Sequence, residues 1–131
     1  MQYLIDTHAF LWFVGNAKEL SKTAKILIED GQNEIFISIA SLWEISIKTA
    51  LKKLTINGKY ESVIDDLTDN SIHILPINFA HTVEQNILPS HHRDPFDRII
   101  ISQAIVEDIN FISADSIFDH YLKGKAIKRI W

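Results

Sequence analysis

The chain has 131 residues, of which 47% are hydrophobic and 23% charged, and its 13 basic residues against 17 acids leave a formal net charge of −4. A chain this apolar offsets the entropy lost on ordering by burial, which excludes intrinsic disorder, and its length suits one domain over residues 1–131. It lacks an apolar run long enough to span a membrane, a basic secretory leader, and any cysteine for disulfides or thiolate metal sites. We therefore expect a soluble, cytoplasmic protein, and the negative charge argues at first sight against a nucleic-acid partner.

Strand-like and helix-like segments alternate along the chain. Short apolar runs predict strands over residues 2–5, 34–39, 72–75 and 111–113, with a further edge strand over 126–131. Helical patterns cover residues 8–14, 21–30, 40–54, 60–69, 80–87 and 95–108. Such alternation predicts an α/β fold in three layers, with a mostly parallel central sheet and helices on both faces.

Two acids directly follow predicted strands. Asp6 comes after Tyr3-Leu4-Ile5, and Asp115 comes shortly after the strand over 111–113. In open parallel sheets, ligands bind beyond the carboxyl ends of the strands, so both positions suit a functional site. Each acid also has a structural interpretation, because Asp is a good N-cap for a helix that begins just after it.

A third acid, Glu44, lies inside a predicted helix. We expect Ala40, Trp43, Ile47, Ala50, Leu51 and Leu54 to form one apolar stripe, with Glu44 half-buried at its edge. The structural alternative is an ion pair with Lys48, four residues further along the same helix.

The segment Asp94-Pro95-Phe96-Asp97 is a helix start, with Asp94 as the N-cap and Pro95 at the first helical position. Both acids would suit the helix dipole, so stability alone could account for them. On a helical projection, however, Asp97 shares its face with Ile101 and points toward the sheet, whereas Asp94 lies nearer the rim.

Asp6, Glu44, Asp97 and Asp115 are therefore predicted to converge at one edge of the sheet. Convergent carboxylates repel one another, and a bound cation relieves that repulsion. These acids offer only oxygen ligands, and the chain has no cysteine and no suitably spaced histidine pair. Such a ligand set favours Mg²⁺ or Mn²⁺ over zinc. Acid clusters with these ions most often serve phosphodiester hydrolysis.

The same residues lie in four blocks that resemble PIN domains, and more narrowly the VapC-type PIN-domain toxins of bacterial toxin-antitoxin modules. The resemblance spans essentially the full length. The blocks are Leu4–Trp12, Ser41–Lys48, Asp94–Ala104 and Ser113–Asp115, in the order expected of the family.

This resemblance implies a PIN-like fold and a Mg²⁺- or Mn²⁺-dependent endoribonuclease that a small antitoxin protein neutralises. It also implies a homodimer, which PIN toxins commonly form. Asp6 resembles the family's first-strand acid, Glu44 its helical acid, Asp97 its third acid and Asp115 its last. In that scheme Asp6, Asp97 and Asp115 hold metal, a metal-bound water attacks the RNA phosphate, and Glu44 binds a second ion or orients the water. The auxiliary residues are Asp94, Ser113 and Thr7.

The basic residues are distributed unevenly. One stretch without acids runs from Ile45 to Tyr60 and contains Lys48 and Lys52, and another follows Asp119. We expect RNA contacts from Lys48 and Lys52, and also from Arg93 and Arg98. The alternative is that these residues are ordinary solvated surface charges that do not bind RNA. Without the four proposed ligands, 13 acids remain against 13 basic residues, so the rest of the molecule is neutral and a nucleic-acid partner becomes compatible with the charge.

Two other functions remain open. A haloacid-dehalogenase-like phosphatase would use Asp6 as its nucleophile, but such enzymes usually carry a second Asp two residues later, where this chain has His8. A non-catalytic interaction module would keep the fold without binding metal.

Overall fold

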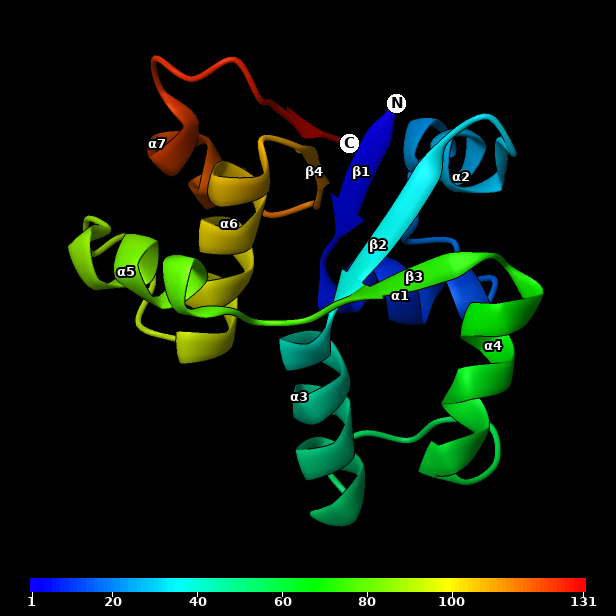
Figure 1. Cartoon of the computed structure of the whole chain (residues 1–131). Coiled ribbons are helices and arrows are strands. Elements are labelled where there is room, and N and C mark those ends of the chain that lie inside the picture. Colours follow the sequence, from blue (N-terminus) through cyan, green and yellow to red (C-terminus); the bar gives the residue numbers. More distant parts are fainter.

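A computed structural model describes residues 1–131, and its centre is a five-stranded sheet in which all neighbouring strands run parallel (Figure 1). The strand order is β3-β2-β1-β4-β5. The strands are β1 (Gln2–Ile5), β2 (Glu34–Ser38), β3 (Ile72–Leu75), β4 (Asn110–Ile112) and β5 (Arg129–Ile130). This arrangement confirms the predicted α/β class and shows that the sheet is parallel throughout.

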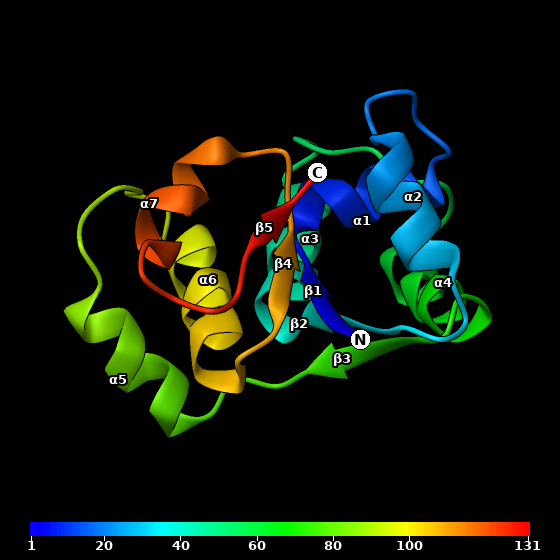
Figure 2. The ribbon, with the colours of Figure 1, turned by 90° about the horizontal axis from the view of Figure 1, so that it is seen from above.

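Helices cover both faces of this sheet. They are α1 (Thr7–Val14), α2 (Lys22–Glu29), α3 (Ile39–Ala50), α4 (Val63–Asp69), α5 (Phe79–Ile87), α6 (Pro95–Glu107) and α7 (Asp119–Leu122), with 3-10 turns at Tyr60–Ser62 and Ser116–Phe118. In Figure 2, α1, α2 and α4 lie on one side of the strands, and α5, α6 and α7 lie on the other. No helix combines the length and the apolar character needed to cross a membrane.

Each face has its own hydrophobic core. Residues from α1, α2 and α4, among them Phe10, Ile28 and Leu67, pack on one face of the sheet. Residues from α6, β4 and α7, among them Ile101, Phe111 and Tyr121, pack on the other. The central strand β1 contributes Ile5 to the first core and Leu4 to the second, because successive side chains of a strand point to opposite faces. β1 is therefore packed on both faces up to its last residue, Ile5.

Helix α3 differs from its prediction. It ends at Ala50 rather than Leu54, and Lys52 then adopts a left-handed conformation with φ 58° that an α-helix does not continue through. The expected apolar stripe is also wrong, because Trp43 is 62% exposed and Leu51 is 59% exposed. The helix extends beyond the end of β2 and contacts both α1 and α6, so it instead buries Ala40, Ser41, Leu42, Glu44 and Ile45.

The predicted strand over 126–131 is also shorter than expected. Only Arg129–Ile130 pairs with β4.

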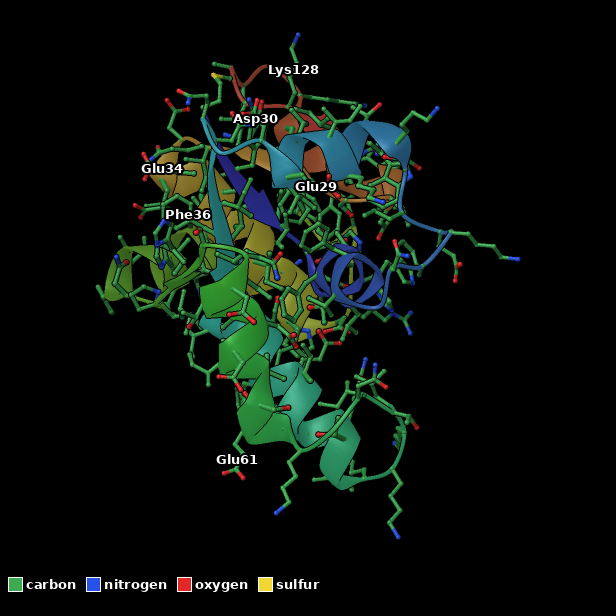
Figure 3. All side chains as sticks on the ribbon, turned by 90° about the vertical axis from the view of Figure 1, so that its right-hand side faces the viewer. Glu29, Asp30, Glu34, Phe36, Glu61 and Lys128 are labelled. Carbon is green, nitrogen blue, oxygen red and sulfur yellow. The ribbon has the colours of Figure 1, made fainter.

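The two ends of the sheet have different surroundings. At the amino ends of the strands, Glu29, Asp30 and Glu34 point outward into solvent (Figure 3). At the carboxyl ends, α1 and α3 begin directly after β1 and β2, and Asp6 and Ser38 are the N-caps of these two helices.

Candidate active site

Asp6 lies directly beyond β1 and is only 8% exposed. Its backbone N–H donates to the carbonyl of Ile112 at 3.1 Å, which fixes its position beside β4. Its Oδ1 accepts the backbone N–H of Ala9 at 2.8 Å and so caps α1. Capping uses one oxygen, so the structural and functional interpretations of Asp6 are compatible. Burial raises the pKa of Asp6, although the Ser113 hydroxyl and the Ala9 N–H both favour the ionised form.

Glu44 is buried rather than half-buried, with 5% exposure. Its Oε1 accepts a hydrogen bond from the hydroxyl of Thr7 at 2.8 Å, and that hydroxyl lies 2.9 Å from Oγ of Ser41. Its Oε2 accepts a hydrogen bond from Nζ of Lys48 at 2.6 Å, which also raises the pKa of that lysine. The predicted ion pair is therefore present, and it joins a network between α1 and α3 that holds Glu44 in one orientation.

Asp94 and Asp97 differ in their environments. Asp94 is exposed, and its Oδ1 caps α6 by accepting the backbone N–H of Phe96 at 2.8 Å. Asp97 is half-buried one turn later, and no group of the chain donates a hydrogen bond to its carboxylate. Burial, followed by the negative charge of Asp94, raises the pKa of Asp97 to about 6. Glu44 and Asp6 contribute smaller increases to this pKa and His92 opposes them, so the carboxylates of Asp97, Glu44 and Asp6 lie within electrostatic reach of one another.

Asp115 lies beyond β4 and is partly exposed. Its Oδ1 accepts the backbone N–H of Ile117 at 3.0 Å, and its Oδ2 lies 2.8 Å from Nε2 of His92. Its negative charge contributes to the raised pKa of Asp6, so the two acids lie within electrostatic reach of each other. The predicted capping role is present here as well, and again it uses a single oxygen.

The four acids offer carboxylate oxygens to a divalent ion. No three His, Asp or Glu side chains of the structure lie close enough together to hold one metal ion. Lys48 already balances Glu44, whereas Asp6 and Asp97 have no cationic partner within 4.0 Å. Asp6 is buried, Asp97 is half-buried, and both have raised pKa values and offer only oxygen ligands. Such a donor set fits a hard ion whose remaining ligands are waters.

The predicted RNA-binding residues occupy different environments. Lys52 and Arg93 are exposed, and Lys48 is partly exposed beside Glu44. Lys48 and Lys53 line a pocket of about 140 Å³ that Glu44 also lines. A larger pocket of about 660 Å³ lies beyond it, around the end of α3 and the loop to Tyr60, and contains none of the four acids.

Arg98 is used inside the chain. Its guanidinium donates to the backbone carbonyls of Pro89, Leu88, Gln85 and His92, at 2.9, 3.2, 3.3 and 3.5 Å. These bonds hold the loop between α5 and α6 closed against the start of α6. We therefore assign Arg98 a structural role and do not retain it among the RNA contacts.

The sequence interpretation missed three residues of this region. Ser41 completes the network of Thr7 and Glu44, and His92 and Tyr121 support Asp115. His92 precedes the Asp94-Pro95 helix start by two residues, which was a local signal for proximity to the site. Tyr121 lies on α7 and has no such signal, because its contact with His92 joins segments 29 residues apart.

Solved structures share this fold at low sequence identity. VapBC2 from Rickettsia felis, bound to a DNA fragment from its promoter, matches with a TM-score of 0.69 and 16% identity over 98% of both chains. VapBC-5 from Mycobacterium tuberculosis, a member of the VapBC family of toxin-antitoxin systems, matches with a TM-score of 0.65 and 14% identity, covering 98% of this chain and 97% of that one.

Sequence comparisons give a family. The chain is 26% identical, over 98% of its length, to the anti-Pycsar protein Apyc1 of Bacillus phage 010DV004, and spans about half (53%) of that relative. The family model of the PIN domain matches residues 3–123. PIN-domain proteins are generally nucleases, and PIN nucleases generally use divalent metal ions. Because this model covers nearly the whole sequence and the sheet has the PIN architecture, the chain belongs to the PIN domain family.

Proposed function

We propose that residues 1–131 form one PIN domain that acts as a Mg²⁺- or Mn²⁺-dependent endoribonuclease, the toxin of a toxin-antitoxin module. The observation that carries this proposal is the gathering of Asp6, Glu44, Asp97 and Asp115 at the carboxyl end of a parallel sheet. Two of these acids, Asp6 and Asp97, have raised pKa values and no cationic partner within 4.0 Å. A protein tolerates such mutual repulsion where a ligand of opposite charge relieves it.

In this proposal Asp6, Asp97 and Asp115 would hold the metal together with coordinated waters, and because no three acids lie close enough to bind one ion directly, some of these contacts would run through water. When bound, a divalent ion lowers the pKa of a coordinated water and offsets the charge of a phosphate. Asp6 is fixed by the end of β1 and by its cap on α1, so its carboxylate needs little reorganisation. Glu44 is held by Thr7 and Lys48, and in that position it would accept a proton from a water or bind a second ion.

The RNA backbone would follow the basic residues beside the acids. Lys48 and Lys53 line the pocket next to Glu44, Lys52 is exposed just before Lys53, and Arg93 is exposed just before Asp94. Phosphate contacts from such residues position a nucleic acid without selecting its sequence. We therefore expect the affinity for RNA to fall as the salt concentration rises.

The partners follow from the same proposal. Several solved proteins with this fold were determined as toxin-antitoxin complexes, and we propose that this chain likewise binds a cognate antitoxin in the cytoplasm. We also propose that it forms a homodimer. A short gene for a DNA-binding protein immediately upstream would support the antitoxin, and light scattering on the purified protein measures the dimer.

Cleavage of RNA by the purified protein tests the enzymatic proposal. The wild-type protein should cleave RNA with Mg²⁺ or Mn²⁺ and lose this activity with EDTA, and Asp6→Asn should be inactive. Asn is as good an N-cap as Asp, so this variant keeps the cap of α1 and its thermal unfolding should stay close to that of the wild type.

The matched control is Asp30→Asn, which makes the same chemical change at the opposite end of the sheet and should cleave like the wild type. Metal-independent cleavage, or equal activity of Asp6→Asn and the wild type, would contradict the assigned site. A wild-type protein that neither binds Mn²⁺ nor cleaves RNA would instead indicate a non-catalytic interaction module.

A further inference from the structure

His92 connects Asp115 to the core. Its Nε2 lies 2.8 Å from Oδ2 of Asp115, and its Nδ1 lies 3.1 Å from the hydroxyl of Tyr121. The backbone N–H of His92 also donates to that hydroxyl at 2.7 Å. The imidazole is packed against Phe118 and stacked on Tyr121, with ring centroids 4.5 and 5.5 Å away, and its side chain is only 8% exposed.

The hydrogen bonds determine which nitrogen of His92 carries a proton. The carboxylate of Asp115 can only accept, so Nε2 must be protonated in order to bond to it. The neutral form with its proton on Nδ1 would place two acceptors 2.8 Å apart. Tyr121 favours the first arrangement, because its oxygen accepts the backbone N–H and its own proton is then free to reach Nδ1.

We propose that His92 is a positioning residue for Asp115 and that Tyr121 acts through His92. This inference rests on the proposed function, in which Asp115 is a metal ligand. Asp115 ends up with each oxygen held by one donor, Nε2 of His92 and the N–H of Ile117, which leaves its carboxylate plane little freedom. Groups that orient a ligand in this way commonly change metal affinity by about 10- to 100-fold when they are removed.

Isothermal titration with Mn²⁺ measures this effect without substrate. We expect His92→Leu, which removes the donor but keeps an apolar side chain against Phe118, to weaken Mn²⁺ binding by about 10- to 100-fold. His92→Gln offers an N–H donor in place of the ring nitrogen and should recover most of that loss. Tyr121→Phe should cause a smaller loss of the same kind.

A double-mutant cycle separates positioning from general damage to the fold. In an Asp115→Asn background, His92→Leu should change Mn²⁺ affinity by less than about twofold, because it acts only through the group already removed. The control His73→Gln alters an exposed histidine on β3, at the opposite edge of the sheet, and should bind Mn²⁺ like the wild type.

NMR spectra of ¹⁵N-labelled histidine give a readout that does not depend on any variant folding. The metal-free wild-type protein should show His92 protonated at Nε2. Protonation at Nδ1 alone, unchanged Mn²⁺ affinity of a folded His92→Leu, or equal losses in both backgrounds would overturn the inference. A wild-type protein without Mn²⁺ binding would overturn the proposed function and this inference together, whereas the three results above leave the proposed function intact.

Discussion

The two ends of the sheet carry acids in opposite environments. At the amino ends, Glu29, Asp30 and Glu34 are exposed, and Lys25 pairs with Glu29 at 3.9 Å on the surface of α2. At the carboxyl ends, Asp6 and Glu44 are buried and Asp97 is half-buried. Solvent screens the first group, while the second group interacts across a less polar space. The burial of the acids therefore says more about function than their number does.

The carboxyl end is also where backbone geometry fixes side chains. Asp6, Asp94 and Asp115 each cap the helix or turn that follows them. The cap binds one oxygen of each carboxylate to the chain, and in Asp115 the other oxygen is held by His92. At the amino end, Asp30 makes a comparable bond to the N–H of Gln32, but in an exposed loop. The difference between the two ends suggests four experiments.

The largest effect is expected from removing the charge of Asp97, one of the two acids at the carboxyl end that have no cationic partner within 4.0 Å. Asp97→Asn should lower the rate of RNA cleavage by about 100-fold or more, as expected for the loss of one group that stabilises the transition state. Glu34→Gln at the amino end should cleave at the wild-type rate. The measurement is single-turnover cleavage of labelled RNA at saturating Mn²⁺. Similar rates for Asp97→Asn and Glu34→Gln would remove the functional distinction between the two ends.

A divalent ion should stabilise the folded protein by binding to the acids at the carboxyl end of the sheet. At a Mn²⁺ concentration 100 times the dissociation constant, the free energy of unfolding should rise by about 2.7 kcal/mol, which corresponds to a Tm increase on the order of 10 °C. The measurement is a thermal unfolding curve with and without Mn²⁺. Asp97→Asn should gain much less, and Glu34→Gln should gain as much as the wild type. Equal gains in all three proteins would show that Mn²⁺ binds elsewhere.

Much of this region was predictable from the sequence. Asp6 and Asp115 follow apolar runs, so their places at strand ends depend on local patterns alone, and the Asp94-Pro95 start of α6 is equally local. The burial of Glu44 was less predictable, because α3 contacts α1 and α6 at once and no single helical stripe describes its buried face. The contact of Tyr121 with His92 joins α7 to a distant loop and has no sequence signal.

The network around Glu44 should be sensitive to the loss of one hydroxyl. Thr7→Val keeps the shape of the side chain but leaves Glu44 without the donor at 2.8 Å. Loss of a buried hydrogen bond to a charged group should lower the free energy of unfolding by about 2 kcal/mol. Urea unfolding measures this change.

Two variants make the Thr7 result specific. Thr7→Ser retains the hydroxyl and should stay closer to the wild type than Thr7→Val does. Thr23→Val makes the same substitution at an exposed position on α2 and should change the free energy of unfolding by less than about 0.5 kcal/mol. If Thr7→Val and Thr23→Val were equally stable, the hydroxyl of Thr7 would not be holding Glu44.

The smallest effect concerns pH. The pKa of Asp97 is about 6 in the folded protein, against an ordinary value of 3.8, so the folded state disfavours the ionised carboxylate. The folded state then binds protons more tightly than the unfolded state between these two values, and stability from this group falls as the pH rises through that window. Because Asp97 is only half-buried, solvent screening reduces the penalty at pH 7.5 to about 1 kcal/mol.

Without metal, Asp97→Asn should therefore be more stable than the wild type at pH 7.5 by about 1 kcal/mol, and this difference should shrink toward zero near pH 4. Comparing the two proteins at each pH cancels the titration of groups that they share. Glu34→Gln should show no such gain, since Glu34 is exposed at the amino end. A difference between Asp97→Asn and the wild type that stays constant with pH would mean that burial does not disfavour the charge of Asp97. The two ends of the sheet would then be electrostatically alike.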